Sequence, residues 1–289
     1  MKASNVDVSK ITLSAVKTMD NGGKMIYLNY DGGINPLLLQ TPEVDIPFDL
    51  DVAKAEEWGK YNVQCNLKDI EGNSEVKVFH DKLLELDGFI KTQAMENSVA
   101  WFKKKKMTEE TIDSLYTPQV KLSFDSETGE PNGKYPPKFG FKITRKDNKV
   151  ACMLYDNKKN VFDVNRETDN PVAIENVLMK GALIKAVLRC NGIWLANGKF
   201  GCTWRAEQIR VKIPEGALKA FAVLSDSDSD DEDEPQEQNL IDDSSEEDNK
   251  SEEENKSDDE EDDEDALALT RQESKPVKKV RRVKVKSGN

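Results

Sequence analysis

The sequence predicts a mainly β domain whose strands close into a small barrel. The clearest observation is a hairpin over residues 191–213, in which two alternating segments flank Asn197-Gly198. This dipeptide favours a type I′ turn, because both central residues of that turn need positive φ. Two further observations agree. Alternating segments recur at about ten-residue spacing near the N-terminus, and the second hairpin strand changes its apolar parity midway, as bulged barrel strands do.

The N-terminal region supplies the first predicted strands, over residues 11–16, 25–30 and 36–41, with glycine-containing turns between them. Two prolines then interrupt the pattern, since proline cannot donate a backbone hydrogen bond to a sheet. Residues 61–67 alternate again. These segments are expected to form part of the barrel wall.

A helical segment is inserted at about residues 73–116. Apolar residues recur there at helical spacing, and Asn73 or Ser74 can serve as the N-cap. Thr108, followed by two glutamates, predicts a second helix start, and Pro118 ends the segment. The apolar positions of the first helix are Val76, Phe79, Leu83, Leu86, Ile90 and Ala94.

The closing hairpin contains a predicted irregularity. In its second strand the apolar residues stand at even-numbered positions up to Ala206 and at odd-numbered positions from Ile209. A one-residue slip would turn the wrong face to the core, so a bulge is expected near Glu207-Gln208. Between the helical insert and the hairpin, strands are predicted at residues 119–124, 139–143 and 150–155.

Charge divides the chain into three parts. Residues 225–265 hold 24 acidic residues and two lysines, a net charge of −22, whereas residues 266–289 carry +7. Residues 1–224 are left with +2, so a slightly basic domain precedes an acidic arm and a basic tip. The arm lacks aromatic residues and both segments are highly charged, so both are expected to be disordered.

Several functional classes are disfavoured. His80 is the only histidine, which excludes a multi-histidine metal site. There is no GxxxxGK[ST] loop, and the aspartates at 45, 49 and 51 read as a turn around a proline. The chain opens without a secretory signal and contains no segment long enough to span a bilayer. A non-enzymatic intracellular protein without cofactor or metal is expected, with reduced cysteines favoured over a Cys190–Cys202 disulfide.

Aromatic and basic residues alternate on the hairpin, and a single-stranded nucleic-acid groove uses this combination: rings stack on bases and cations hold phosphates. The aromatics could equally fill the core, and the lysine run after Trp101 could be merely solvated or line a phosphate track. The predicted nucleic-acid-binding residues are Trp101, Lys103, Lys104, Lys105, Lys106, Tyr135, Lys138, Phe139, Lys142, Trp194, Lys199, Phe200, Trp204, Arg205 and Arg210.

The acidic arm admits two interpretations. It is either a solubilising spacer or a mimic of nucleic acid that competes for the protein's own cationic groove and recruits replication partners such as a DNA polymerase. Serines in the arm, Ser225 among them, precede an acidic residue by three positions, the pattern of acidophilic kinase sites, and phosphate would add negative charge. The basic tip, Lys275 to Lys286, fits a nuclear-localisation signal, a nucleic-acid tether or a segment that folds back on the arm.

Five segments of residues 1–224 share their order with a known family: Tyr30-Asp31-Gly32, residues 39–42, Tyr116-Thr117-Pro118, Tyr135-Pro136-Pro137 and residues 194–208. Together they resemble the single-stranded-DNA-binding proteins of large nucleocytoplasmic DNA viruses, which are similar to the podophage replication single-strand-binding protein with an acidic C-terminal tail. The resemblance implies a five-stranded OB-fold barrel with a helix between strands, and a tail acting in trans. The basic tip departs from this family, whose tails often end in acidic and aromatic residues.

We therefore expect a protein that binds and protects single-stranded DNA during viral replication or recombination, in the host nucleus or a cytoplasmic virus factory. RNA stays open as a ligand, because stacking and phosphate contacts serve both nucleic acids, and so does a homodimer. The alternatives are a virion-structural or histone-chaperone-like protein that binds basic proteins through its tail, and a nucleic-acid-processing enzyme.

Overall fold

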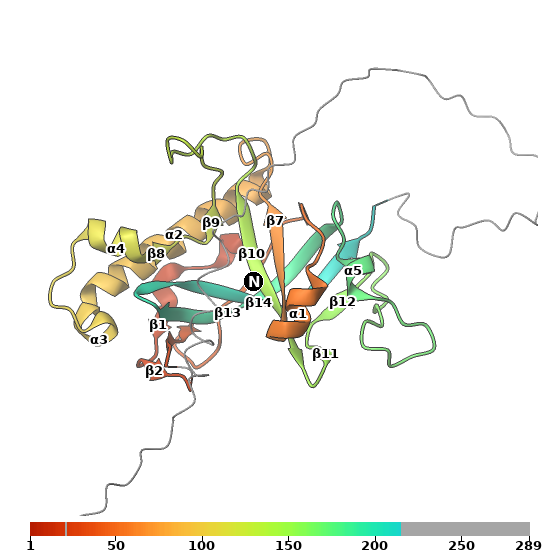
Figure 1. The fold of residues 1–289 in the computed structure, drawn as a ribbon, viewed down its shortest axis with the longest axis horizontal. Helices are drawn as coiled ribbons and strands as arrows, with labels where there is room; N and C mark the ends of the chain where they lie inside the picture. Colours follow the sequence, from red (N-terminus) through yellow and green to blue (C-terminus); the bar gives the residue numbers. More distant parts are fainter. Residues whose placement is uncertain (21, 215–289) are drawn as a thin grey trace, which may run out of the picture.

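The computed structural model describes residues 1–20 and 22–214 (Figure 1), so the predicted acidic arm and basic tip lie outside the described residues. The fold is mainly β, as predicted. In chain order the strands are β1 (Ile11–Leu13), β2 (Lys17–Thr18), β3 (Lys24–Ile26), β4 (Leu28–Tyr30), β5 (Leu38–Gln40), β6 (Val44–Asp45), β7 (Lys60–Asn66), β8 (Tyr116–Thr117), β9 (Val120–Lys121), β10 (Lys138–Lys146), β11 (Lys149–Val150), β12 (Met153–Tyr155), β13 (Leu183–Ala196) and β14 (Lys199–Lys212).

The helices gather mainly in the predicted insert. The first of them is capped by Asn73, whose side chain accepts hydrogen bonds from the first-turn amides, and it continues through Gly88 without a break. A helix that the sequence reading missed begins after Asp51, whose carboxylate accepts from the Lys54 amide at 3.0 Å. The helices are α1 (Val52–Trp58), α2 (Ser74–Glu96), α3 (Ser98–Phe102), α4 (Glu109–Leu115) and α5 (Ile174–Val177), with 3₁₀ turns at Ala3–Asn5 and Val8–Lys10.

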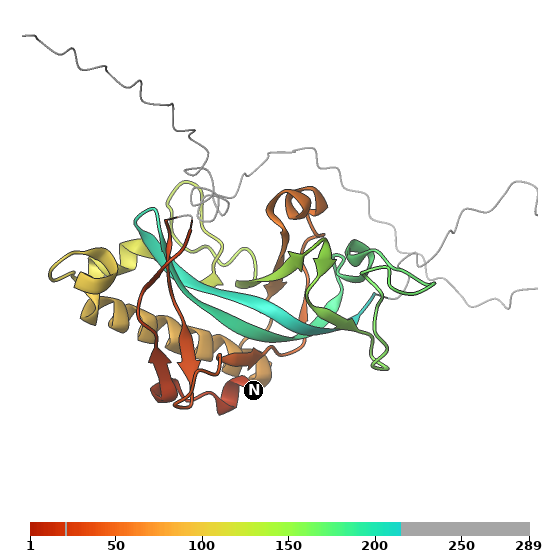
Figure 2. The ribbon, with the colours of Figure 1, turned by 90° about the horizontal axis from the view of Figure 1, so that it is seen from below.

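The long hairpin β13–β14 is the centre of the sheet. Its turn has the predicted positive φ angles, 49° at Asn197 and 83° at Gly198. The predicted bulge is confirmed, because the pairing shifts so that Glu207 has no partner on β13. A second shift at Asn191 was not predicted. Figure 2 shows both strands bending across the whole molecule, with α2–α4 towards one end of the hairpin.

Five wall segments curl around the core: β13, β14, β10, β7 and the β5–β6 segment. β10 joins β14 in parallel, β7 pairs with β10 in antiparallel register, and β5 and β6 pair with β13. The ring closes between β7 and β6, where the Asn66 side-chain amide donates to Asp45 at 2.7 Å. This arrangement is the OB-like barrel with a helical insert that was expected.

Helix α2 packs against the buried side of this wall. The ring of its Phe79 meets Phe139 of β10 edge-on at 5.4 Å. A buried polar network ties the same helix to the sheet: the Tyr116 hydroxyl and the Gln119 side-chain amide donate to Asp87 at 2.5 and 2.6 Å. Burial raises the pKa of Asp87. The outer side of β10 is therefore the side left for a ligand.

The remaining polar groups singled out in the sequence have structural roles. Asp45 also pairs with Lys68, and Asp49 accepts from the Lys180 amide at 2.8 Å. Cys190 and Cys202 are free thiols whose sulfurs lie 3.4 Å apart. Within the described part of the chain, no helix combines the length and apolarity that crossing a bilayer requires.

Candidate nucleic-acid interface

Strand β10 separates a buried row from a basic row. Phe139, Phe141 and Ile143 are buried, with exposed fractions of 1, 3 and 0%. Because side chains alternate along a strand, Lys138 and Lys142 point to the opposite face. Two of the predicted binding residues thus lie on the outer side of the barrel wall.

Strand pairing brings three more cations to this row. On one edge of β10, Lys142 lies opposite Asn62 of β7 and Thr144 opposite Lys60, so Lys60 is a diagonal neighbour of Lys142 on the same face. On the other edge, Lys121 of β9 lies opposite Lys138, and Arg205 of β14 lies beside Lys142. We call Lys60, Lys121, Lys138, Lys142 and Arg205 the basic face.

The cations of the basic face act on one another. The pKa of Lys142 is lowered to about 7, first by burial and then by the charges of Lys60 and Lys121. The pKa of Lys60 is also lowered, mainly by burial, while its hydrogen bond to Lys142 acts in the opposite direction. Crowded cations of this kind raise the local positive potential and favour an anionic ligand.

Exposed aromatic rings flank the basic face. Phe48, in the loop between β6 and α1, is 55% exposed, and the Lys138 ammonium lies 5.0 Å from its ring centre. Tyr135, in the loop before β10, is 59% exposed and lies beneath Lys134. Rings next to lysines can stack on bases whose phosphates the lysines hold.

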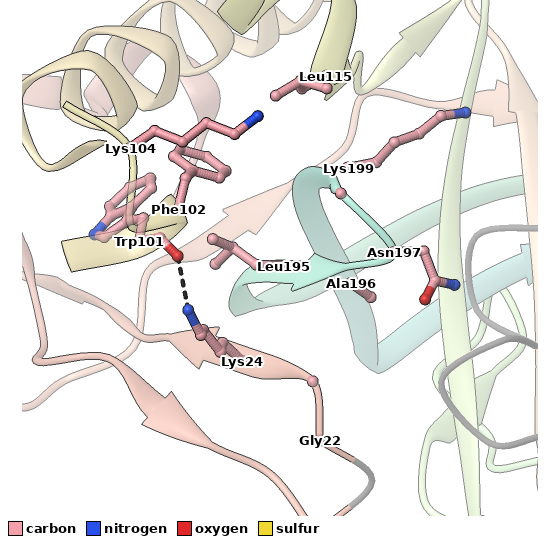
Figure 3. Close-up of a pocket in the computed structure, with 12 residues that line it drawn as sticks. Gly22, Lys24, Trp101, Phe102, Lys104, Leu115, Leu195, Ala196, Asn197 and Lys199 are labelled. Atoms are coloured by element: carbon pink, nitrogen blue, oxygen red, sulfur yellow. Dashed lines mark hydrogen bonds between the residues drawn. The ribbon is translucent and has the colours of Figure 1, made fainter. Parts of the chain in front are cut away.

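A second basic site lies at the tip of the hairpin. A pocket of about 360 Å³ lies between the β2–β3 turn, the end of α3 and the β13–β14 turn. Figure 3 shows the residues that line it. Lys24, Lys104 and Lys199 line it, and the Lys24 ammonium donates to the Trp101 carbonyl at 2.8 Å. Phe102, Leu115 and Leu195 supply its apolar lining. The exposed lysines 103, 105 and 106 lie in the loop after α3.

Four predicted stacking residues are instead core residues. Trp101, Phe139, Phe200 and Trp204 are 4, 1, 0 and 2% exposed, so none offers a ring face to a base. The Trp204 indole donates to Gln119 at 2.5 Å, and Phe200 packs between other rings at 5.1 and 5.2 Å. The prediction was wrong for Phe139, Phe200 and Trp204 because barrel strands bury every second side chain. It was wrong for Trp101 because this residue is buried on helix α3.

One further predicted ring and the two predicted arginines are partly engaged by neighbouring residues. Trp194 is half-buried, and its indole packs over Gly201. A Cβ added to Gly201 would lie 3.0 Å from the indole, so the ring rests directly on the backbone there. Arg205 pairs with Glu207 at 3.0 Å and Arg210 with Glu43 at 3.3 Å. Both arginines are therefore partly neutralised by carboxylates.

The residues predicted from the sequence do not include Lys60, Lys121 and Phe48. Lys121 lies in the predicted strand 119–124, and Lys60 directly precedes the alternating segment 61–67. Only the pairing of β7 and β9 with β10 shows that the two lysines share a face. Phe48 follows a proline in a loop, and its position over Lys138 depends on a contact across 90 residues. No local pattern reveals such a contact.

No protein-family model matches this chain, and no curated protein matches its sequence. Its fold is similar to solved structures of phage proteins. One is a single-stranded DNA-binding protein from bacteriophage Enc34 in complex with single-stranded DNA: identity is 11%, the match covers 72% of this chain and 98% of that chain, and the TM-score is 0.39. Another is the single-stranded DNA-binding protein encoded by bacteriophage T7, with 14% identity, 68% and 98% coverage and a TM-score of 0.36.

Proposed function

We propose that this protein binds single-stranded DNA without reading its sequence, along a path that crosses the basic face. The observation that carries the proposal is the basic face itself, a cluster of cations on one side of the barrel wall with the exposed rings of Phe48 and Tyr135 beside it. Lysines hold the phosphates and rings stack on bases, which needs no contact with base edges.

The path continues towards the hairpin tip in this proposal. Lys199, Gly201, Thr203 and Arg205 share one parity on β14, and six residues of strand span roughly 20 Å. That distance links the basic face to the pocket that holds Lys24 and Lys104. The bound DNA would thus contact two groups of lysines, one in the middle of the β13–β14 hairpin and one at its tip.

The finer parts of the proposal rest on the sequence. The role is in viral replication or recombination, as the resemblance to viral proteins implies. The acidic arm competes with DNA for the cations and recruits replication proteins. A chain that ends at Leu224 should then bind single-stranded DNA more tightly than the whole chain, and with a steeper salt dependence.

Fluorescence anisotropy with a labelled oligo-dT at several salt concentrations tests the proposal. The whole chain should bind, and duplex DNA should compete poorly. Lys138→Gln should weaken binding, and the slope of log affinity against log salt concentration should become shallower by about one, the value of one lost phosphate contact. Lys77→Gln is the matched control, because Lys77 lies on α2 at the opposite side of β10 and pairs with Asp81 at 3.6 Å.

Two results would contradict the proposal. The first is the absence of any binding to oligo-dT. The second is equal weakening by Lys138→Gln and Lys77→Gln, which would mean that charge alone and not the basic face decides affinity. Tight binding of a basic protein such as a histone, with no affinity for DNA, would favour the chaperone-like alternative.

A further inference from the structure

We propose that Lys60 and Lys142, with Gln64 and Lys121 around them, form a phosphate subsite in the middle of the basic face, and that this subsite takes up one proton as a phosphate binds. The inference rests on the proposed function, because the phosphate it takes is a phosphodiester of the bound strand. It adds a chemical property that a solvated lysine does not have.

The subsite is defined by the pairing of β7 with β10. Lys60 and Lys142 are diagonal neighbours on one face, and their side chains hydrogen-bond to each other. Gln64 shares their face and lies opposite Gly140, one outward position along β10 from Lys142. Gly140 is exposed, and a Cβ added there would touch only the Val63 carbonyl, at 3.7 Å. The missing side chain leaves room above the strand.

A polar atom without a partner lies at the same place. The Gln64 side-chain oxygen Oε1 is buried and has no hydrogen-bond partner. A buried polar atom without a partner costs about 1–3 kcal/mol. The two ends of an amide side chain can exchange by rotation, so Gln64 can also present its N–H groups to a phosphate oxygen.

Two lysine side chains in direct contact repel each other when both are protonated, so full protonation of the pair is unfavourable. The hydrogen bond between them raises the pKa of Lys60 and lowers that of Lys142. The pKa of Lys142 falls to about 7, with burial as the largest cause. Near neutral pH the empty pair therefore holds one ammonium and a partly deprotonated amine.

The charged groups around Lys142 reinforce this state. Lys121 on β9 and Arg205 on β14 lie along one edge of β10, and Lys138 lies on β10 itself. The carboxylate of Glu207 on β14 is bound by Arg205 at 3.0 Å. Among the described residues, the charges of Lys60 and Lys121 lower the pKa of Lys142.

A phosphodiester brings a negative charge between the two nitrogens. The lone pair of the Lys142 amine then takes a proton from the solvent, and two ammonium groups flank one anion. One N–H bond forms, one buffer acid loses its proton, and no other bond changes. The pKa of Lys142 rises in the bound state, because an opposite charge stabilises the protonated form.

The sign of the pH dependence follows. Below about pH 6, Lys142 is charged with or without DNA, so affinity does not depend on its proton. Above pH 7 the free protein must gain the proton on binding, so affinity falls as pH rises. Linkage for one proton with a free pKa of about 7 gives a loss of about fivefold from pH 7 to 8 and roughly tenfold from pH 8 to 9.

Isothermal titration calorimetry of the whole chain with oligo-dT at pH 8 measures the proton directly. The binding heat should vary with the ionisation enthalpy of the buffer, and the slope should correspond to uptake of about 0.9 proton. Lys142→Arg should bind with no uptake from this subsite and a flatter pH profile, because guanidinium stays charged at every pH used. Lys77→Gln should keep the full uptake.

A second measurement separates this inference from the proposed function. The ¹³Cε resonance of Lys142, assigned by its loss in Lys142→Arg, should titrate near neutral pH in the free protein and above pH 9 with oligo-dT or inorganic tripolyphosphate. Oligo-dT binding without proton uptake would overturn the inference and leave the function intact. A response to tripolyphosphate without DNA binding would support the subsite and contradict the function. An ordinary lysine titration in the free protein would overturn the subsite.

Discussion

Trp204 shows how a single residue can suit two opposite roles in a sequence. It stands in a strand rich in cations, which favours a stacking role, yet it is 2% exposed. Its indole N–H donates to Gln119, which in turn donates to the buried carboxylate of Asp87. The ring therefore stabilises the contact between α2 and the barrel wall.

Trp204→Phe tests this role. The substitution keeps an aromatic ring but removes the indole N–H that donates to the Gln119 side-chain oxygen. The unpartnered oxygen should lower the free energy of unfolding by about 1–3 kcal/mol. Chemical denaturation measures this loss. Affinity for oligo-dT, measured by anisotropy on the folded variant, should stay within twofold of the unsubstituted chain. A large loss of affinity at unchanged stability would return Trp204 to the interface.

Phe48 should behave in the opposite way. Its ring is 55% exposed and lies beside the Lys138 ammonium. Phe48→Ala should lower affinity for oligo-dT by about 1–3 kcal/mol, the usual value of one stacked base, with little change in stability. Leu84→Ala is the control, because Leu84 is also half-exposed but lies on α2. Equal affinities for the two variants would remove Phe48 from the path.

At the scale of elements, the hairpin β13–β14 was the most predictable part of the chain. Its turn and its first bulge follow from local sequence, Asn197-Gly198 and the parity change after Ala206. The second bulge, at Asn191, was missed because a polar residue and a glycine there give no parity signal. Its cause is tertiary: Gly192 has φ of 124° and lies against the Ile26 backbone.

Gly192→Ala should therefore destabilise the barrel. A Cβ at this position would lie 2.5 Å from the Ile26 carbonyl oxygen, and the positive φ alone costs about 1–3 kcal/mol for a non-glycine residue. Gly88→Ala is the matched control: nothing lies within 4 Å of a Cβ there, and alanine in a helix interior gains about 0.5–1 kcal/mol. Thermal unfolding should shift in opposite directions. A Gly192→Ala variant as stable as the parent would refute the packing argument.

At the scale of the whole molecule, the basic face joins residues that are far apart in the sequence. Lys60, Lys121, Lys142 and Arg205 come from four strands and meet only because β10 pairs with β7 on one edge and with β9 and β14 on the other. The sequence could therefore predict the fold class and name three cations of the basic face. It could not predict which cations share a face, because strand order and register are long-range properties.

Photo-crosslinking of the whole chain to an oligonucleotide that carries 5-bromodeoxyuridine tests the central claim most directly. Peptide mapping by mass spectrometry then identifies the residues that touch bases. We expect cross-links on the peptides that contain Phe48 or Tyr135. In the Phe48→Ala variant, the cross-link on the peptide that contains position 48 should be lost. Cross-links confined to the outer surface of α2, with none beside the basic face, would contradict the proposed path of the strand.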